Sequence, residues 1–265
     1  MSVPRFENRT VIVTGAGSGI GRAAALKFAQ EGANVGLFEL NPERAEEVRQ
    51  ELEAIRPGSA LVCEVDVSDL EAMEAAYQAV TDRFGGLDAV FANAGINGAM
   101  GPIEHMELSE FQKTIDVNLG GMFLSVKLAV PHMKKRGGGS IVITSSVNGN
   151  TRFSSIGMSP YSTSKAGQVA FAKMAALELA RYRIRVNTIC PGAISTNIEE
   201  TTETNERMEE IAIPLEFPRG GDHPLAGRHG LPEEVADLAV FLASSEARHV
   251  TGASITVDGG ESLLF

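Results

Sequence analysis

TVIVTGAGSGIG (residues 10–21) joins a short β-branched run to a glycine-rich turn, and a helical pattern, RAAALKFA, follows at residues 22–29. The β-branched residues favour a buried strand over 10–14. Glycines let a backbone approach a ligand closely, and the free N–H groups at the start of a helix attract phosphate. The stretch therefore predicts a strand–turn–helix unit that binds the pyrophosphate of a dinucleotide.

The glycine spacing selects one phosphate-binding motif among three. It does not fit G-x-G-x-x-G, because Ile20 occupies the place of the third glycine, and it lacks the closing Gly-Lys-Ser/Thr of the nucleotide-triphosphate loop. It fits T-G-x-x-x-G-x-G, formed by Thr14, Gly15, Gly19 and Gly21. The alternative is a tight glycine turn without a ligand, which the flanking strand and helix disfavour.

Further strand-like runs alternate with helical patterns along the chain. These runs, the first included, lie at 10–14, 34–38, 60–64, 89–92, 140–144, 185–189 and 254–257. Such alternation predicts an α/β fold with a parallel sheet covered by helices on both faces. The chain has 265 residues, of which 43% are hydrophobic, and it contains no linker-like or repeated segment. We therefore predict one domain over residues 1–265.

An acidic residue, Glu39, ends the second strand-like run. A carboxylate at this place hydrogen-bonds both ribose hydroxyls and repels a 2′-phosphate. No lysine or arginine follows before Arg44, so the pattern favours NAD over NADP. The alternative is an exposed carboxylate that precedes the helix expected over 42–56.

Tyr161 and Lys165 stand four residues apart within a helical pattern, which places them on one helix face. A free tyrosine titrates near pH ~10, and lowering that pKa by about three units requires roughly 4 kcal/mol of preference for the phenolate. A neighbouring ammonium together with a cationic cofactor ring could supply it. Such a pair also occurs by chance in about one chain in a dozen of this composition, so the pair alone is weak evidence.

With these segments in place, the chain resembles the short-chain dehydrogenase/reductase family, in its single-domain branch. The resemblance runs essentially end to end, and the motifs occur in family order, from the glycine loop to Val-Asp-Gly-Gly at 257–260. It implies a Rossmann-type doubly wound parallel sheet of about seven strands. It also implies hydride transfer between a nicotinamide cofactor and a secondary alcohol or ketone.

The resemblance assigns four catalytic residues, Asn118, Ser146, Tyr161 and Lys165. Tyr161 would exchange the proton on the alcohol oxygen, and Ser146 would donate a hydrogen bond to that oxygen. Lys165 would lower the pKa of the tyrosine and bind the nicotinamide ribose, while Asn118 would hold a water through which Lys165 exchanges protons. Read singly, each residue has a purely structural alternative.

The resemblance also assigns the cofactor contacts. Asp66 would contact the adenine, the Asn-Ala-Gly motif at 93–95 would line the cofactor, and residues 191–196 would hold the carboxamide. The expected cofactor-binding residues are Gly15, Ser18, Gly19, Ile20, Gly21, Glu39, Asp66, Val67, Asn93, Ala94, Gly95, Tyr161, Lys165, Pro191, Gly192, Ile194 and Thr196.

One departure from the family concerns the catalytic serine. In most relatives it precedes the tyrosine by thirteen residues, whereas Ser146 lies fifteen before Tyr161, which indicates a two-residue insertion within 147–160. Counting thirteen residues back from Tyr161 reaches Asn148, which lies beyond the end of the expected strand. The position of Ser146 at the strand end therefore favours Ser146. Ser145 remains a second claimant, and the insertion is expected to reshape one wall of the pocket.

The second departure is the long segment 197–231, which precedes a helix expected from Pro232. Its first half is acidic and its second half is rich in proline and glycine. We expect a mobile substrate lid with a short helix, and we interpret its charge run as a solvated face. His223 and His229 lie in this segment and could contact the substrate. The better interpretation is that both are solvated loop residues. Apolar residues that could form a pocket for a neutral, moderately hydrophobic substrate are Met158, Ile194, Met208, Ile211 and Phe217.

Composition excludes several classes of protein. The net charge of −11 argues against nucleic-acid binding, and no apolar run approaches the ~20 residues of a membrane span. Two cysteines without metal or redox spacing indicate free thiols in a reducing compartment, so we expect a cytoplasmic protein. The five histidines show no ligand spacing, and we predict no metal site.

Three functions remain open. The first is an NAD-dependent alcohol dehydrogenase, and the second is an NADPH-dependent 3-oxoacyl-type reductase, against which Glu39 and the acidic lid count. The third is a non-catalytic dinucleotide-binding scaffold, against which the intact catalytic set counts. The resemblance further implies a homotetramer or homodimer through helices around 107–136 and 161–182. Phe171, Met174 and Leu177 fit such an interface or, equally, a core.

Overall fold

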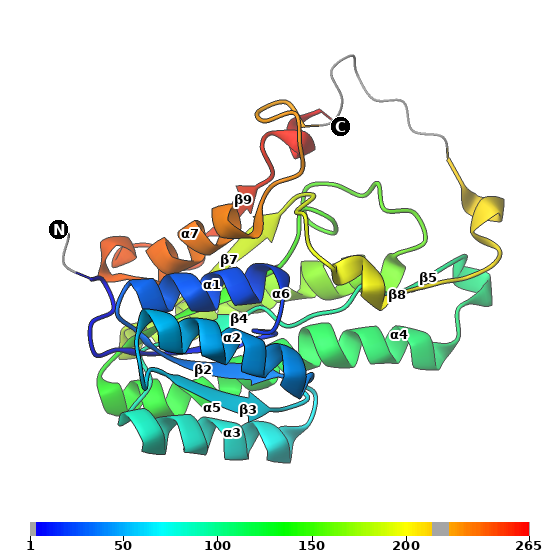
Figure 1. Cartoon of the computed structure of the whole chain (residues 1–265). Helices are drawn as coiled ribbons and strands as arrows, with labels where there is room; N and C mark the ends of the chain where they lie inside the picture. Colours follow the sequence, from blue (N-terminus) through cyan, green and yellow to red (C-terminus); the bar gives the residue numbers. More distant parts are fainter. Residues whose placement is uncertain (1–3, 214–222, 265) are drawn as a thin grey trace.

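The computed structural model describes residues 4–213 and 223–264, and its main feature is a parallel sheet of seven strands in the order β3-β2-β1-β4-β6-β7-β9 (Figure 1). Every run that the sequence marks as a strand lies in this sheet. The strands are β1 (Thr10–Thr14), β2 (Asn34–Glu39), β3 (Ala60–Glu64), β4 (Ala89–Ala92), β6 (Gly139–Thr144), β7 (Ile184–Pro191) and β9 (Ser254–Val257). The predicted Rossmann-type sheet is confirmed.

Helices cover both faces of the sheet, with α1 and α7 above it and α3 and α5 below it in Figure 1. One hydrophobic cluster joins α1, α2 and α7 to one face, and a second joins α3, α5 and α6 to the other. The strands are apolar along nearly their whole length because both of their faces are buried. The helices are α1 (Gly19–Gln30), α2 (Pro42–Ile55), α3 (Leu70–Phe84), α4 (Leu108–Ile115), α5 (Gly121–Arg136), α6 (Ser159–Leu179) and α7 (Pro232–Ala243).

The helix expected over 107–136 is not continuous, which corrects the sequence-based prediction. A π-helical turn, Asp116–Gly120, separates α4 from α5. Single π-turns widen a helix locally and often mark functional positions. This one carries the fully buried Asn118, whose amide bonds to the backbone of Ile96 at 2.8 and 2.9 Å.

Two short strands that the sequence did not reveal form a second parallel pair, β5 (Gly98–Met100) with β8 (Thr202–Thr204). This pairing holds the first part of the expected lid against the body of the molecule. The short helix expected in the lid is present as a 3₁₀ turn at Met208–Ile211. Part of segment 197–231, including Phe217, lies outside the described residues.

None of the helices within the described ranges combines the length and the apolar character that crossing a bilayer requires.

Candidate active site

A cavity of about 730 Å³ opens at the carboxyl ends of the central strands, where loops from both halves of the sheet meet. Ligands of open α/β sheets bind at this edge. All of the cofactor-binding residues expected from the sequence line the cavity except Gly21, and all of the expected catalytic residues line it except Asn118. The structure therefore brings together, in one cavity wall, residues that lie up to 181 positions apart in the chain, from Gly15 to Thr196.

The glycine loop forms one end of this cavity. A side chain at Gly21 would place its Cβ 1.9 Å from the carbonyl oxygen of Gly15, so Gly21 packs behind the loop and does not face a ligand. Gly15 and Gly19 have φ values of 64° and 50°, which disfavour other residues. Ser18 precedes α1 without capping it through its side chain, unlike Asn41 before α2. The backbone thus forms a cradle that side chains would fill, and it fits a pyrophosphate.

Asn93 links the ends of three strands beneath this loop. Its amide donates to the carbonyl of Thr14 at 3.2 Å, and its Oδ1 accepts from the hydroxyl of Thr144 at 3.0 Å. Thr14 Oγ1 in turn accepts the backbone N–H groups of Asn93 and Ala94. These bonds fix the cavity floor where β1, β4 and β6 end.

Glu39 lies at the opposite side of the glycine loop, at the end of β2. Its carboxylate accepts the N–H of Gly17 at 2.8 Å and the N–H groups of Leu40 and Asn41 at 3.0 Å each. Glu39 therefore has both a structural role in the loop and a place in the cavity wall. Arg44, which lines the same region, pairs with Glu200 of the lid segment at 3.0 Å.

Tyr161 and Ser146 lie together in the cavity wall, where the Ser146 side chain interacts with the tyrosine hydroxyl. Desolvation of the half-buried tyrosine raises its pKa above the ordinary value, and the interaction with Ser146 opposes that rise. The sequence predicted a net lowering of this pKa. Among the protein groups present the desolvation is larger, so the lowering would require the cofactor charge that the prediction also invoked.

The geometry separates the two adjacent serines. Ser146 Oγ accepts the N–H of Asn148 at 3.1 Å, which leaves its own proton for Tyr161 or for a bound oxygen. Ser145 Oγ instead donates to the carbonyl of Lys165 at 2.8 Å and accepts from Asn150 at 3.0 Å. Ser145 is thus occupied in holding α6, and Ser146 is the better candidate for orienting a substrate.

Lys165 lies one helical turn from Tyr161, with its Nζ 5.4 Å from the centre of the tyrosine ring. The side chain is buried and donates to the carbonyl of Thr144 at 2.9 Å. Asn118 packs nearby, but its amide is occupied by Ile96 and by Ser164, 3.1 Å away. Its backbone carbonyl accepts from Gln168 at 2.7 Å, so any water held by Asn118 would share that carbonyl.

Burial lowers the pKa of Lys165 from 10.5 to about 8. Between about pH 8 and pH 10.5 the unfolded chain binds more protons at Lys165 than the folded chain does. The contribution of Lys165 to the free energy of unfolding therefore rises with pH over this range. Below about pH 8 the folded state bears the whole cost of the buried charge. We therefore compare the free energies of unfolding of cofactor-free wild type and cofactor-free Lys165→Met. Between pH ~8 and pH ~9.5 we expect the difference between them to shift in favour of wild type. Urea unfolding at both pH values tests this, and parallel profiles would refute it.

One interaction in the wall was not predicted. Arg152, within the insertion, pairs with Glu261 near the C-terminus, and their side chains are only 10% and 8% exposed. Glu261 also accepts the N–H of Ala193 at 2.9 Å. The pair thus ties the insertion to the segment expected to hold the carboxamide. Ion pairs between residues 109 positions apart leave no local signal in a sequence.

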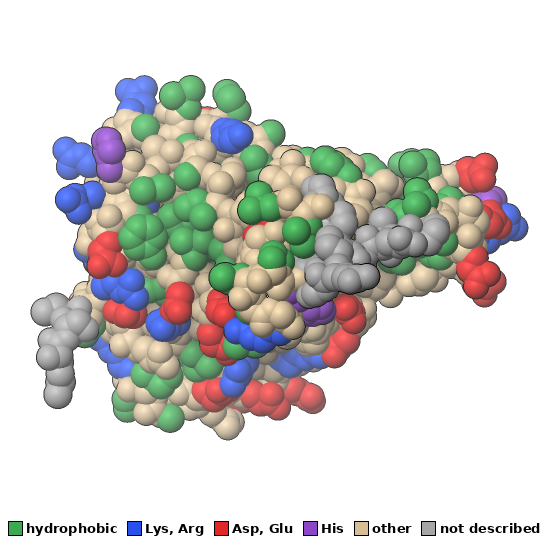
Figure 2. Space-filling model, turned by 90° about the horizontal axis from the view of Figure 1, so that it is seen from above, with side chains coloured by type: hydrophobic (Ala, Val, Ile, Leu, Met, Phe, Trp, Pro, Cys, Tyr) green, Lys and Arg blue, Asp and Glu red, His purple; other side chains and the backbone are tan. Residues whose placement is uncertain are grey.

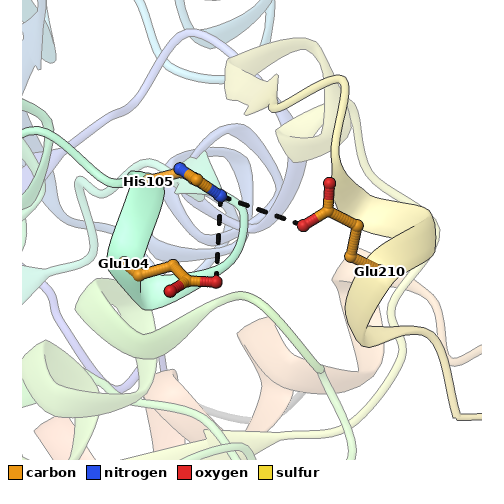
Figure 3. Close-up of side chains that lie close together, drawn as sticks. All are labelled: Glu104, His105 and Glu210. Atoms are coloured by element: carbon orange, nitrogen blue, oxygen red, sulfur yellow. Dashed lines mark ion pairs between the residues drawn. The ribbon is translucent and has the colours of Figure 1, made fainter.

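A separate side-chain cluster lies at the far end of the molecule, where His105 stands between Glu104 and Glu210, 3.8 Å from each carboxylate (Figure 3). Among the described residues these three side chains are the group that could hold a metal ion. However, Arg207 hydrogen-bonds the same His105 nitrogen at 3.0 Å, and a neighbouring cation disfavours a metal. The cluster is better described as an ion-pair network between the 103–105 turn and the lid segment.

The chain is similar to known proteins over nearly its whole length. A family model described as Enoyl-(Acyl carrier protein) reductase matches residues 15–262. The chain is 36% identical over 268 residues to levodione reductase of Leifsonia aquatica, covering 98% of this chain and 97% of the relative. It is 37% identical over 255 residues to cyclohexanol dehydrogenase of Acinetobacter sp., covering 96% of this chain and 95% of the relative.

A solved structure is also similar over its whole length. The crystal structure of a 3-ketoacyl-ACP reductase from Sinorhizobium meliloti has a TM-score of 0.91 and 45% identity, covering 97% of this chain and 100% of that one. Full-length identity at this level, together with the cavity, confirms the resemblance seen in the sequence. The chain therefore belongs to the short-chain dehydrogenase/reductase family and is an NAD(P)-dependent oxidoreductase acting on CH–OH groups.

Proposed function

We propose that this chain is an NAD-dependent dehydrogenase of neutral secondary alcohols, with Tyr161 as the general acid and base. The observation that carries the proposal is the arrangement of Tyr161, which lies with Ser146 in the cavity wall and one helical turn from the buried Lys165. A bound nicotinamide supplies the hydride chemistry. The protein supplies position, a proton acceptor and stabilisation of charge.

Each side chain has a defined part in the proposed reaction. In the oxidation direction Tyr161 Oη accepts the alcohol proton, and in reduction it returns that proton to the carbonyl oxygen. Ser146 donates a hydrogen bond to the same oxygen and so stabilises the charge that develops on it. The Lys165 ammonium favours the phenolate, and Asn118 fixes the backbone of Ile96 beside this group.

Glu39 supports the preference for NAD, because its carboxylate lines the cavity at the end of β2. A 2′-phosphate placed beside it would meet a like charge. We expect wild type to prefer NAD over NADP in kcat/KM, and Glu39→Gln to reduce that preference by about tenfold. Glu43→Gln, which makes the same charge change in the first turn of α2 but outside the cavity, is the matched control. Better use of NADP than NAD by wild type would contradict the assignment.

The substrate is proposed to be neutral and moderately hydrophobic, such as a cyclic or aliphatic secondary alcohol. Met158 and Ile194 line the cavity and support this, and the similarity to a cyclohexanol dehydrogenase supports a cyclic substrate. Met208 and Ile211, also expected in the pocket, do not line it. His229 does line it, so a contact with substrate remains a proposal for this residue.

We also propose that segment 197–231 forms a substrate lid and that residues 1–265 form one domain.

A second candidate is a 3-oxoacyl-type reductase, which the 45% identity to the Sinorhizobium meliloti enzyme favours. Such an enzyme would meet an acidic carrier, whereas the described part of the lid carries Glu199, Glu200 and Glu203. Figure 2 shows acidic side chains along one edge of the face seen from above and at the tip of its projecting end, with some basic side chains beside them. These acidic charges favour the alcohol dehydrogenase.

Titration with NAD, NADH, NADP and NADPH, followed by assays on secondary alcohols, ketones and an acyl-carrier thioester, separates the candidates. Tight NAD(H) binding with turnover of an alcohol supports the proposal. NADPH preference with turnover of the thioester supports the reductase. Tight binding without turnover of any compound would support a non-catalytic scaffold.

We further propose a cytoplasmic homotetramer or homodimer. Met174 and Leu177, on α6, are 67% and 76% exposed, so they do not serve the core of one chain. Phe123 of α5 packs edge-to-face on Phe171 beside them, and the four residues form an apolar surface suited to a second copy. The free thiols of Cys63 and Cys190 support a reducing compartment.

A further inference from the structure

Asn148, in the insertion that follows β6, is a buried polar residue in the wall of the active-site cavity. It is 7% exposed and lines the same cavity as Ser146 and Tyr161. Neither its Oδ1 nor its Nδ2 has a hydrogen-bond partner among residues 4–213 and 223–264. A buried amide normally bonds through both atoms, because leaving them unpaired costs free energy.

Other asparagine amides around the cavity do not share this property. Asn97, in the same wall, donates from Nδ2 to Thr202 Oγ1 at 2.9 Å. Asn150 donates to Ser145 Oγ and to the carbonyl of Ser146, and Asn93 bonds to Thr14 and Thr144. The unpaired amide is therefore a property of Asn148 and not of the polar wall in general.

The loop that carries Asn148 is held in place on several sides. Its backbone N–H donates to Ser146 Oγ at 3.1 Å, and residue 148 forms a β-bridge with Arg152. Arg152 is in turn paired with Glu261. Gly149, with φ of 88°, packs so closely on Ser162 that a Cβ would lie 2.3 Å from its carbonyl oxygen. The amide thus has a fixed position next to the serine that contacts the reacting oxygen.

We propose that Asn148 binds a second oxygen of the substrate, a hydroxyl or a carbonyl close to the reacting carbon. The amide can donate through Nδ2 and accept through Oδ1, so it matches the uncharged oxygen of a ketone as well as that of an alcohol. The enzyme then prefers hydroxyketones, diketones and diols to simple ketones and alcohols. This inference rests on the proposed function, because it assumes that Ser146 and Tyr161 hold the reacting oxygen.

Two ring ketones matched in size, cyclohexanone and 2-hydroxycyclohexanone, test the proposal in NADH-dependent reduction. We expect wild type to favour the hydroxyketone in kcat/KM by about tenfold or more, because a site built to bond a hydroxyl rejects the analogue that lacks it. Asn148→Leu, nearly isosteric but apolar, is expected to remove this preference by lowering the hydroxyketone value and leaving the cyclohexanone value within about twofold. Asn148→Ala gives the same test if the leucine variant does not fold. Asn97→Leu, which removes an already bonded amide from the same wall, is expected to affect both ketones alike.

The outcomes separate this inference from the proposed function. Reduction of both ketones with equal efficiency, unchanged in Asn148→Leu, would overturn the role of Asn148 and leave the dehydrogenase standing. A weaker Kd for NADH in Asn148→Leu, measured by fluorescence titration, would also overturn it, because the amide would then serve the cofactor. Absence of turnover on every secondary alcohol and ketone would remove the proposed function and this inference together.

Discussion

The Tyr161→Phe variant is expected to lose kcat by about a thousandfold or more while binding NADH with a Kd within about threefold of wild type. The substitution deletes only the phenolic oxygen, which is the group proposed to exchange the substrate proton and which interacts with Ser146. The ring remains to pack in the cavity wall beside Lys165. Steady-state turnover with a secondary alcohol and fluorescence titration with NADH give the two quantities.

A second tyrosine provides the matched control for this variant. Tyr182 follows α6, where its ring lies 3.7 Å from the Nζ of Lys134, and it does not line the cavity. Tyr182→Phe is therefore expected to retain the wild-type kcat. Turnover by Tyr161→Phe at the rate of this control would refute the assignment of the proton-transfer residue.

The Gly21→Ala variant is expected to weaken NADH binding by at least about tenfold and to lower stability by about 2 kcal/mol. The added Cβ would lie 1.9 Å from the Gly15 carbonyl oxygen and 2.8 Å from the amide of Asn93. Both neighbours are fixed, one as backbone of the phosphate loop and the other by its bonds to Thr14 and Thr144. The loop must therefore shift, and its N–H groups lose their alignment with the pyrophosphate. NADH titration and urea unfolding measure the two effects.

Gly120→Ala is the control for this substitution, because a Cβ there meets no atom closer than 3.9 Å. It adds the same methyl group to another helical glycine at low cost. If Gly21→Ala bound NADH with wild-type affinity, the close packing of Gly21 behind the loop would not be needed for pyrophosphate binding, and this prediction would be wrong.

Local patterns in the sequence were sufficient for the sheet and the glycine loop. A parallel strand is buried on both faces, so runs such as 10–14 and 140–144 stand out as apolar segments between amphipathic helices. Glycines that need a positive φ or close packing, such as Gly15 and Gly21, are visible because their spacing is itself local. Glu39 at the end of a strand-like run and the Tyr161–Lys165 pair on one helix face are likewise local patterns. The other site assignments follow from the family resemblance, and the chemical roles of all these residues stay predictions.

The features that the sequence did not reveal depend on contacts between distant residues. The β5–β8 pairing and the Arg152–Glu261 pair join segments about a hundred positions apart. The π-turn interrupts an otherwise helical pattern and carries Asn118, which binds the backbone of Ile96, and no periodicity encodes that contact. For the same reason the sequence around Asn148 does not indicate a buried amide, whose atoms lack a partner among residues 4–213 and 223–264 of the folded chain.

The transfer of a labelled hydride tests the proposed dehydrogenase activity most directly. A secondary alcohol carrying deuterium on its carbinol carbon is incubated with NAD and the wild-type enzyme, and the reduced cofactor is analysed by mass spectrometry. We expect NADH that carries one deuterium at C4 of the nicotinamide, formed by wild type and by Tyr182→Phe but not at a measurable rate by Tyr161→Phe. NADH formed without deuterium, or deuterated NADH formed equally well by Tyr161→Phe, would contradict the proposal.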